Sequence, residues 1–157
     1  MQTNEETMSF REKNITVSLI SFTLILVFYS LRLLQIVRTG FEAGSVFRLW
    51  GVVIVLTIVM IIAGTILAHI FSAILEAIRT GEEPTEIEDL QDERDQLIDL
   101  RGTRVSYTVS SIGVFLAMLS FVLGQPPLVM FTLLIFAGLM AQIIGDIARL
   151  VLYRWGF

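Results

Sequence analysis

The residues best suited to chemistry in this chain are polar groups that stand within or beside strongly apolar segments. Burying a polar group among hydrocarbon is costly, so its presence there indicates a functional site or a specific partner. His69, Gln142 and Asp146 are such groups, with Ser72 and Glu76 close by in the sequence of one segment. Because histidine titrates near neutral pH, these side chains could form a path for protons or cations. The alternative is that His69 only donates a hydrogen bond to a neighbouring helix.

Other kinds of chemistry find no support. The chain contains no cysteine, which excludes a disulfide framework, a thiol nucleophile and a thiolate metal site. No serine, histidine and aspartate stand in a recognisable catalytic arrangement, and phosphate loops and dinucleotide fingerprints are absent. Basic and aromatic residues do not interleave as in nucleic-acid binding proteins. We therefore predict no catalytic residues, no metal, no cofactor, no nucleic-acid partner and no enzymatic activity.

The elements that position these residues are expected to be transmembrane helices. Of the 157 residues 55% are hydrophobic, and the mean hydropathy is +0.78, which is too apolar for an ordinary soluble domain. The apolar residues form four blocks, each near the roughly 20 residues that cross a bilayer. The sequence thus predicts an all-α membrane protein, a single domain over 1–157. The predicted helices cover about 12–38, 47–79, 103–123 and 127–154.

The distribution of Lys and Arg predicts the orientation. With four spans, both termini and the connector between the second and third helices lie on one side of the membrane. Eight of the 11 Lys and Arg residues belong to that side. Since cytoplasmic segments carry an excess of Lys and Arg, we predict a multi-pass protein of the inner (plasma) membrane with both termini in the cytoplasm.

The connector, GEEPTEIEDLQDERDQLIDLRGTR, predicts a further helix over about 85–100. Thr85 and Glu88, directly after Pro84, match a capping box. Apolar and acidic residues fall on different sides of this helix, as in an amphipathic helix that rests on a surface or a partner. The apolar set is Ile87, Leu90, Leu97 and Ile98, and the acidic set is Glu88, Asp92, Asp95 and Asp99. Gly102 then allows a bend into the third helix.

Small residues recur at every fourth position in the second and fourth helices. The two stripes are Gly64, Ala68 and Ser72, and Ala137, Ala141 and Gly145. In lipid, such stripes let two helix backbones approach closely. The two stripes align when the sequence of the fourth helix is aligned with that of the second. In the same way, TVSLI of the first helix aligns with TVSSI of the third. The four helices are therefore expected to form two hairpins with a possible internal repeat. We expect the second and fourth helices to cross at their stripes.

Opposite charges stand one turn beyond the two stripes. Glu76 follows the stripe of the second helix, and Arg149 follows that of the fourth. At matching depth these side chains could form a charge-assisted hydrogen bond. A similar pairing places Glu12 of the first helix opposite Arg104 of the third. Both ion pairs are expected to fix the register of the packed helices.

Two stretches carry a resemblance to known proteins. MSFREKN before the first helix and DERDQLIDLRGTR before the third resemble those of small prokaryotic four-helix integral membrane proteins that are filed as a domain of unknown function. The resemblance covers the layout and these two stretches. It implies the same architecture, and it implies no activity and no catalytic residues.

Two functions fit these features. The expected one is a non-enzymatic interaction or regulatory subunit that docks a cytoplasmic or membrane protein through the acidic helix 85–100. The alternative is a small oligomeric ion or proton channel or transporter, with a path along His69, Glu76, Gln142 and Asp146. The absence of a broken helix with an unpaired midplane charge favours the first. A homo-oligomer in the lipid bilayer is expected, because one copy has little interior volume.

Overall fold

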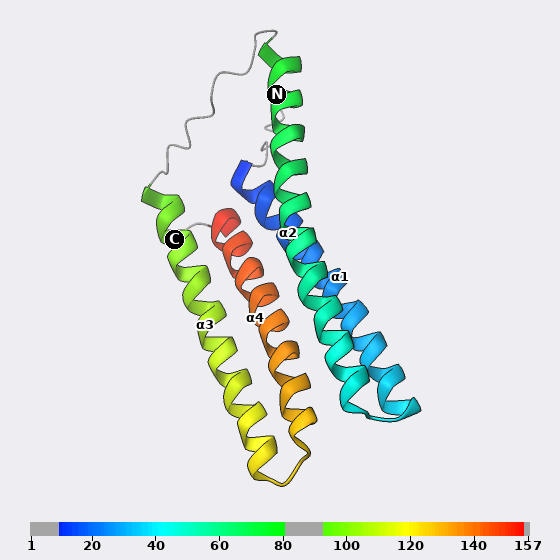
Figure 1. Ribbon diagram of the computed structural model, residues 1–157. Helices are drawn as coiled ribbons and strands as arrows, with labels where there is room; N and C mark the ends of the chain where they lie inside the picture. The colour runs from blue at the N-terminus through cyan, green and yellow to red at the C-terminus, as the bar shows by residue number, and fades with distance from the viewer. Residues whose placement is uncertain (1–9, 81–92, 156–157) are drawn as a thin grey trace.

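The computed structural model describes residues 10–80 and 93–155, and within these ranges all regular structure is helical (Figure 1). The helices are α1 (Phe10–Thr39), α2 (Ala43–Thr80), α3 (Glu93–Val122) and α4 (Pro127–Trp155). All four are long and apolar enough to cross a membrane. The prediction of an all-α chain with four helices of this kind is therefore confirmed.

Glycine and proline set the ends of the helices at the two short connections. Gly40 and Gly124 have φ values of +134° and +85°, which residues with a Cβ rarely adopt. Pro127 is the first residue of α4, where its missing N–H removes no helical hydrogen bond. Residues 40–42 and 123–126 lie at one end of the molecule, here called the loop end (Figure 1). The opposite end, where α1 and α3 begin, is called the terminal end.

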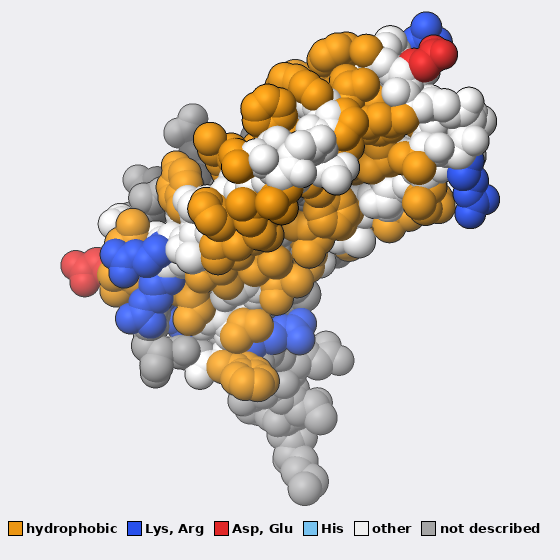
Figure 2. Space-filling view, turned by 90° about the horizontal axis from the view of Figure 1, so that it is seen from below, with side chains coloured by type: hydrophobic (Ala, Val, Ile, Leu, Met, Phe, Trp, Pro, Cys, Tyr) orange, Lys and Arg blue, Asp and Glu red, His pale blue; other side chains and the backbone are white. Residues whose placement is uncertain are grey.

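The helices neighbour one another in the order α3, α4, α1, α2. α4 packs along α3 and against α1, and α1 packs along α2, whereas α2 touches α4 only slightly. In one strongly apolar 18-residue window of each helix, 28% of the residues are buried in α4, against 11% in α2 and 6% in α3. Hydrophobic side chains accordingly cover most of the face seen in Figure 2. An apolar surface of this extent is unfavourable in contact with water, so lipid or another protein is expected to cover it.

Large side chains hold α1, α2 and α4 together. The buried residues of this cluster are Ile25, Tyr29, Leu49, Val53 and Leu139. Within it, the Tyr29 hydroxyl donates a hydrogen bond of 2.8 Å to the Thr132 carbonyl oxygen, which joins α1 to α4. The Tyr29 ring can therefore be buried among apolar side chains, because its hydroxyl still has a hydrogen-bond partner.

Small residues, in contrast, bring α3 and α4 together. A Cβ added at Gly113 would collide with Ala137, and one added at Gly145 would collide with the Ser106 side chain. Ala117 is fully buried. The close approach of two backbones through Gly, Ala and Ser is the packing expected between helices in lipid.

The start of α3 differs from the prediction. α3 begins at Glu93 and continues through Gly102 to Val122, so Gly102 does not interrupt the helix. The described part of the predicted connector helix, residues 93–100, forms the first two turns of α3, and residues 85–92 lie outside the described residues. Gly102 instead allows the Arg149 side chain to lie directly against α3, because a Cβ at this position would collide with it.

Candidate functional site

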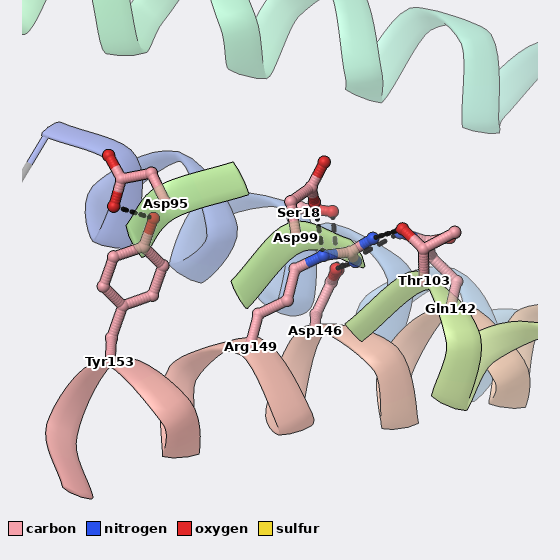
Figure 3. Close-up of polar contacts among 8 residues, drawn as sticks. All are labelled: Ser18, Asp95, Asp99, Thr103, Gln142, Asp146, Arg149 and Tyr153. Atoms are coloured by element: carbon pink, nitrogen blue, oxygen red, sulfur yellow. Dashed lines mark hydrogen bonds and ion pairs between the residues drawn. The ribbon is translucent and has the colours of Figure 1, made fainter. Parts of the chain in front are cut away.

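A group of linked polar side chains lies toward the terminal end, between α1, α3 and α4 (Figure 3). Arg149 of α4 is at its centre. Its Nε donates to Asp99 at 2.8 Å, one terminal nitrogen donates to Asp146 at 2.8 Å, and the other donates to the Thr103 hydroxyl at 2.9 Å. Every nitrogen of the guanidinium therefore has an acceptor, and two of the three acceptors belong to α3.

Asp146 is the most deeply buried charge described in the group, with a side chain only 3% exposed. One carboxylate oxygen accepts from Arg149 and from Gln142, the latter at 3.2 Å. The other accepts from the Ser18 hydroxyl of α1 at 2.7 Å. A buried carboxylate is tolerated only with an opposite charge and further donors, and Asp146 has both. Asp146 thereby connects α4 to α1, as Arg149 connects α4 to α3.

The helical repeat and two glycines position this group. Gln142, Asp146 and Arg149 are spaced by four and three residues, which places them on neighbouring turns of one side of α4. Gly102 leaves the space through which the Arg149 side chain crosses α3. Gly145 lets the backbone of α4 approach Ser106 and the Gly102 carbonyl oxygen. The small residues thus bring the helices close enough for the guanidinium to reach α3.

A second set of polar contacts lies nearer the end of α4. The Tyr153 hydroxyl donates to Asp95 at 2.8 Å, and Arg11 of α1 forms an ion pair of 3.3 Å with the same carboxylate. In Figure 3, Tyr153 points toward Asp95 while Arg149 reaches between its acceptors. The acidic residues at the start of α3 are therefore directed at α1 and α4.

Two pockets flank the polar group. One, of about 220 Å³, is lined by charged residues including Arg11, Asp99 and Arg149. The other, of about 160 Å³, lies between α1 and α2 and includes Ser18. Asn14 lines both. Ser18, whose hydroxyl donates to Asp146, thus lines the smaller pocket, and Arg149, which also pairs with Asp146, lines the charged one.

The chemistry of this arrangement is that of an internally neutralised ion pair. Within residues 10–80 and 93–155, no group of three or more His, Cys, Asp or Glu could hold a metal ion. Arg149 and Asp146 neutralise one another, and Ser18, Gln142 and Thr103 supply the remaining hydrogen bonds. The group can fasten three helices, and Asp146 is its one deeply buried carboxylate among these residues.

The small-residue stripes pack on helices other than those expected. Ala137 and Gly145 face Gly113 and Ser106 of α3, and Gly64 faces Val17 of α1. Ala141, in the middle of the α4 stripe, is buried. The expected crossing of α2 and α4 at the stripes differs from the structure, where these helices barely touch. α3 has small residues of its own, so it can approach α4 more closely than α2 can.

The stripe of α2 continues with Ala68 and Ser72, and the polar path begins at His69. Their side chains, like that of Glu76, lie outside the described residues. The predicted ion pair between Glu76 and Arg149 therefore stays a prediction. The partners of Arg149 that the structure describes belong to α3 and α4.

The second predicted ion pair, between Glu12 of α1 and Arg104 of α3, stays a prediction. Arg104 is exposed, and none of the ion pairs described joins it to Glu12. α4 lies between α1 and α3 in the packing order and separates the two helices.

Sequence reasoning missed three members of the polar group: Ser18, Asp99 and Thr103. A signal for the partner helix was present, since α3 carries its own small residues at spacings of three and four. These are Gly102, Ser106, Ser110, Gly113 and Ala117. Asp99 and Thr103 are spaced by four residues and flank Gly102, which marks the place where a long side chain can cross. The hydroxyl of Ser106 is buried there without a hydrogen-bond partner among the described residues.

Comparison with protein-family models, with curated proteins and with solved structures finds no match to this chain. The function must therefore be inferred from the geometry of the chain itself.

Proposed function

We propose that this chain is a non-enzymatic integral membrane protein that acts as an interaction or regulatory subunit. The observation that supports this most directly is that all three nitrogens of Arg149 donate to side chains of the same protein. A charge held in this way is suited to fixing helices. In this proposal the protein is a multi-pass protein of the inner membrane with both termini cytoplasmic.

The packing toward the loop end also favours this function over conduction through one copy. The cluster around Ile25, Tyr29 and Leu49 is closed by large apolar side chains. The two pockets that flank the polar group measure only about 220 and 160 Å³ and belong to the terminal half. A conducting path would have to cross the apolar cluster or lie between copies of the chain.

In the described part of segment 85–100, the docking surface that we propose is apolar, whereas the sequence predicted an acidic one. Asp95 and Asp99 are occupied by Arg11, Tyr153 and Arg149. The outward residues instead include Leu97 and Leu100, which are 48% and 61% exposed. In this proposal, these two exposed leucines form the contact with another protein.

The docking proposal can be tested by site-specific photo-crosslinking in cells. A photoreactive amino acid at Leu97 or Leu100 is expected to give a discrete protein adduct, and the same probe at Val122, 77% exposed at the loop end, serves as the matched control. A folded Leu97→Ser/Leu100→Ser variant, with the probe at a neighbouring exposed position such as Gln96, should lose the adduct. Identical lipid-only products at all positions would contradict a docking surface here.

Homo-oligomerisation belongs to the same proposal. α2 and α3 stand at the two ends of the packing order, and each has one main neighbour. Their apolar faces are free for lipid or for a second copy. Covering them with further copies would bury surface that the single chain leaves exposed.

A small channel or transporter is the second candidate, and one observation favours it. Ser18 lines the pocket of about 160 Å³ and donates a hydrogen bond to the buried Asp146, so a space that could hold water lies one hydrogen bond away from a carboxylate deep in the helices. Reconstitution in liposomes decides between the candidates. Proton or ion flux that is lost in Asp146→Asn and His69→Ala would establish conduction, whereas flux no greater than in empty liposomes would exclude it.

A further inference from the structure

The largest pocket described lies at the loop end, far from the polar group around Arg149. It is a groove of about 580 Å³ between α1 and α2. Its volume falls within the range of about 300–1,000 Å³ that is usual for small-molecule sites. α1 ends and α2 begins beside it, and both helices are long and apolar enough to cross a membrane, so the groove lies at one end of two candidate spans.

Two arginines, Arg32 of α1 and Arg48 of α2, line this groove from opposite helices. No carboxylate lines it. Within the described residues neither guanidinium forms an ion pair. Arg32 donates to the Gln35 amide oxygen at 3.2 Å and stands 5.8 Å from the centre of the Phe28 ring. The groove therefore presents two positive charges that the described side chains do not neutralise.

The rest of the lining has the opposite character. Phe28, Ile36, Leu49 and Val52 form an apolar wall. Leu49 also belongs to the buried cluster, so this wall is continuous with the rigid part of the protein. Ser45 and Thr39 add hydroxyl groups near the arginines. A ligand that fits must carry a negative, oxygen-rich group and a hydrocarbon part directly joined to it.

We propose that this groove binds an anionic phospholipid, with Arg32 and Arg48 on its phosphate and the start of one acyl chain along Phe28 and Leu49. Guanidinium groups bind phosphate by paired, charge-assisted hydrogen bonds. A free phosphate would use the arginines and leave the apolar wall empty. A zwitterionic lipid such as phosphatidylcholine offers a phosphate too, but it brings a positive ammonium group into a groove that already holds two arginines and no carboxylate, so it should bind less well. The site does not depend on the proposed docking function, since it lies at the other end of the helices.

The first test measures lipid retention by the full-length chain. The protein is purified in detergent, given phosphatidylglycerol or phosphatidylcholine, and analysed by native mass spectrometry. Wild type should prefer phosphatidylglycerol. An Arg32→Gln/Arg48→Gln variant should lose about tenfold or more of that binding, because a hydrogen bond to a charged group is worth about a factor of ten. Arg38→Gln/Arg104→Gln is the matched control, since it removes the same charge from exposed positions outside the groove.

The second test separates a lipid from a free phosphate. Glycerol 3-phosphate should neither stabilise the protein against heating nor displace phosphatidylglycerol at equal concentration. A Val52→Trp variant, which fills the apolar wall and keeps both arginines, should lose phosphatidylglycerol retention as well. Equal retention by wild type and by Arg32→Gln/Arg48→Gln would overturn the proposal. Displacement of the lipid by glycerol 3-phosphate would also overturn it, because the acyl chain would then contribute nothing.

Discussion

Replacing Asp146 by asparagine should destabilise the protein far more than the same replacement at Asp99. Both carboxylates lie 2.8 Å from a nitrogen of Arg149, so the two changes remove the same charge from the same partner. They differ in exposure, because the side chain of Asp146 is 3% exposed and that of Asp99 is 64% exposed. The comparison therefore isolates the effect of burial on one ion pair.

The expected magnitudes follow from that difference. Removing one partner of a buried ion pair costs about 3–5 kcal/mol, and asparagine keeps one acceptor oxygen, so Asp146→Asn should lose about 3 kcal/mol. An exposed pair contributes less than about 1 kcal/mol, so Asp99→Asn should lose no more than that. In the double variant Asp146→Asn/Arg149→Met, the loss should be smaller than the sum of the single losses, because Arg149→Met alone leaves the buried Asp146 without its positive partner, and the double variant removes that carboxylate as well.

Reversible unfolding in mixed detergent and SDS micelles, followed by circular dichroism, gives the free energies for this comparison. Wild type, the two asparagine variants, Arg149→Met and the double variant are measured under identical conditions. Equal losses at Asp146 and Asp99, or strictly additive losses in the double variant, would refute the view that burial of this pair stabilises the bundle.

Two further predictions concern helix packing. Gly145→Ala should destabilise the protein by about 1–3 kcal/mol, because the added Cβ collides with the Ser106 side chain. Adding Ser106→Ala should restore most of this loss, since the closest atom is the Ser106 hydroxyl oxygen. Gly138→Ala is the control, because a Cβ there meets open space. Tyr29→Phe should cost about 1 kcal/mol through loss of its hydrogen bond to an α4 carbonyl, whereas Tyr107→Phe, at a side chain 71% exposed, should leave stability unchanged. Both are read from the same unfolding assay, and a loss at a control position as large as at its counterpart would contradict them.

The sequence predicted the four helices well because apolar length is a local property. Blocks of about 20 apolar residues and the turns at Gly40 and Pro127 are visible without knowledge of the fold. The interruption expected at Gly102 was wrong for a physical reason. A glycine in a helix permits either a bend or the close approach of another side chain. At Gly102 the structure shows the second, because the Arg149 side chain lies against it.

The partners of the small-residue stripes could not be deduced from the stripes alone. A row of small residues shows that a helix is approached closely, and it does not show by which helix. Matching α4 to α2 by their similar stripes overlooked that similar helices in a repeat can each pack on the helix before them, as Gly64 does on α1 and Ala137 on α3. The sequence singled out the polar residues Gln142, Asp146 and Arg149, and the structure brings them together in one group, but their acceptors and donors on α1 and α3 depend on that packing.

Disulfide crosslinking tests most directly whether the stripe of α4 packs on α3, and the natural absence of cysteine makes the background clean. A Cβ built at Gly145 falls 3.1 Å from the Ser106 Cβ, close to the separation of about 3.5–4.5 Å found in disulfides. Mild oxidation of the Ser106→Cys/Gly145→Cys variant should consume both thiols within one chain, while Gly64→Cys/Ala137→Cys should keep its thiols reactive. The reverse outcome, with a crosslink between positions 64 and 137 and none between 106 and 145, would contradict the structure's arrangement of α4 against α3.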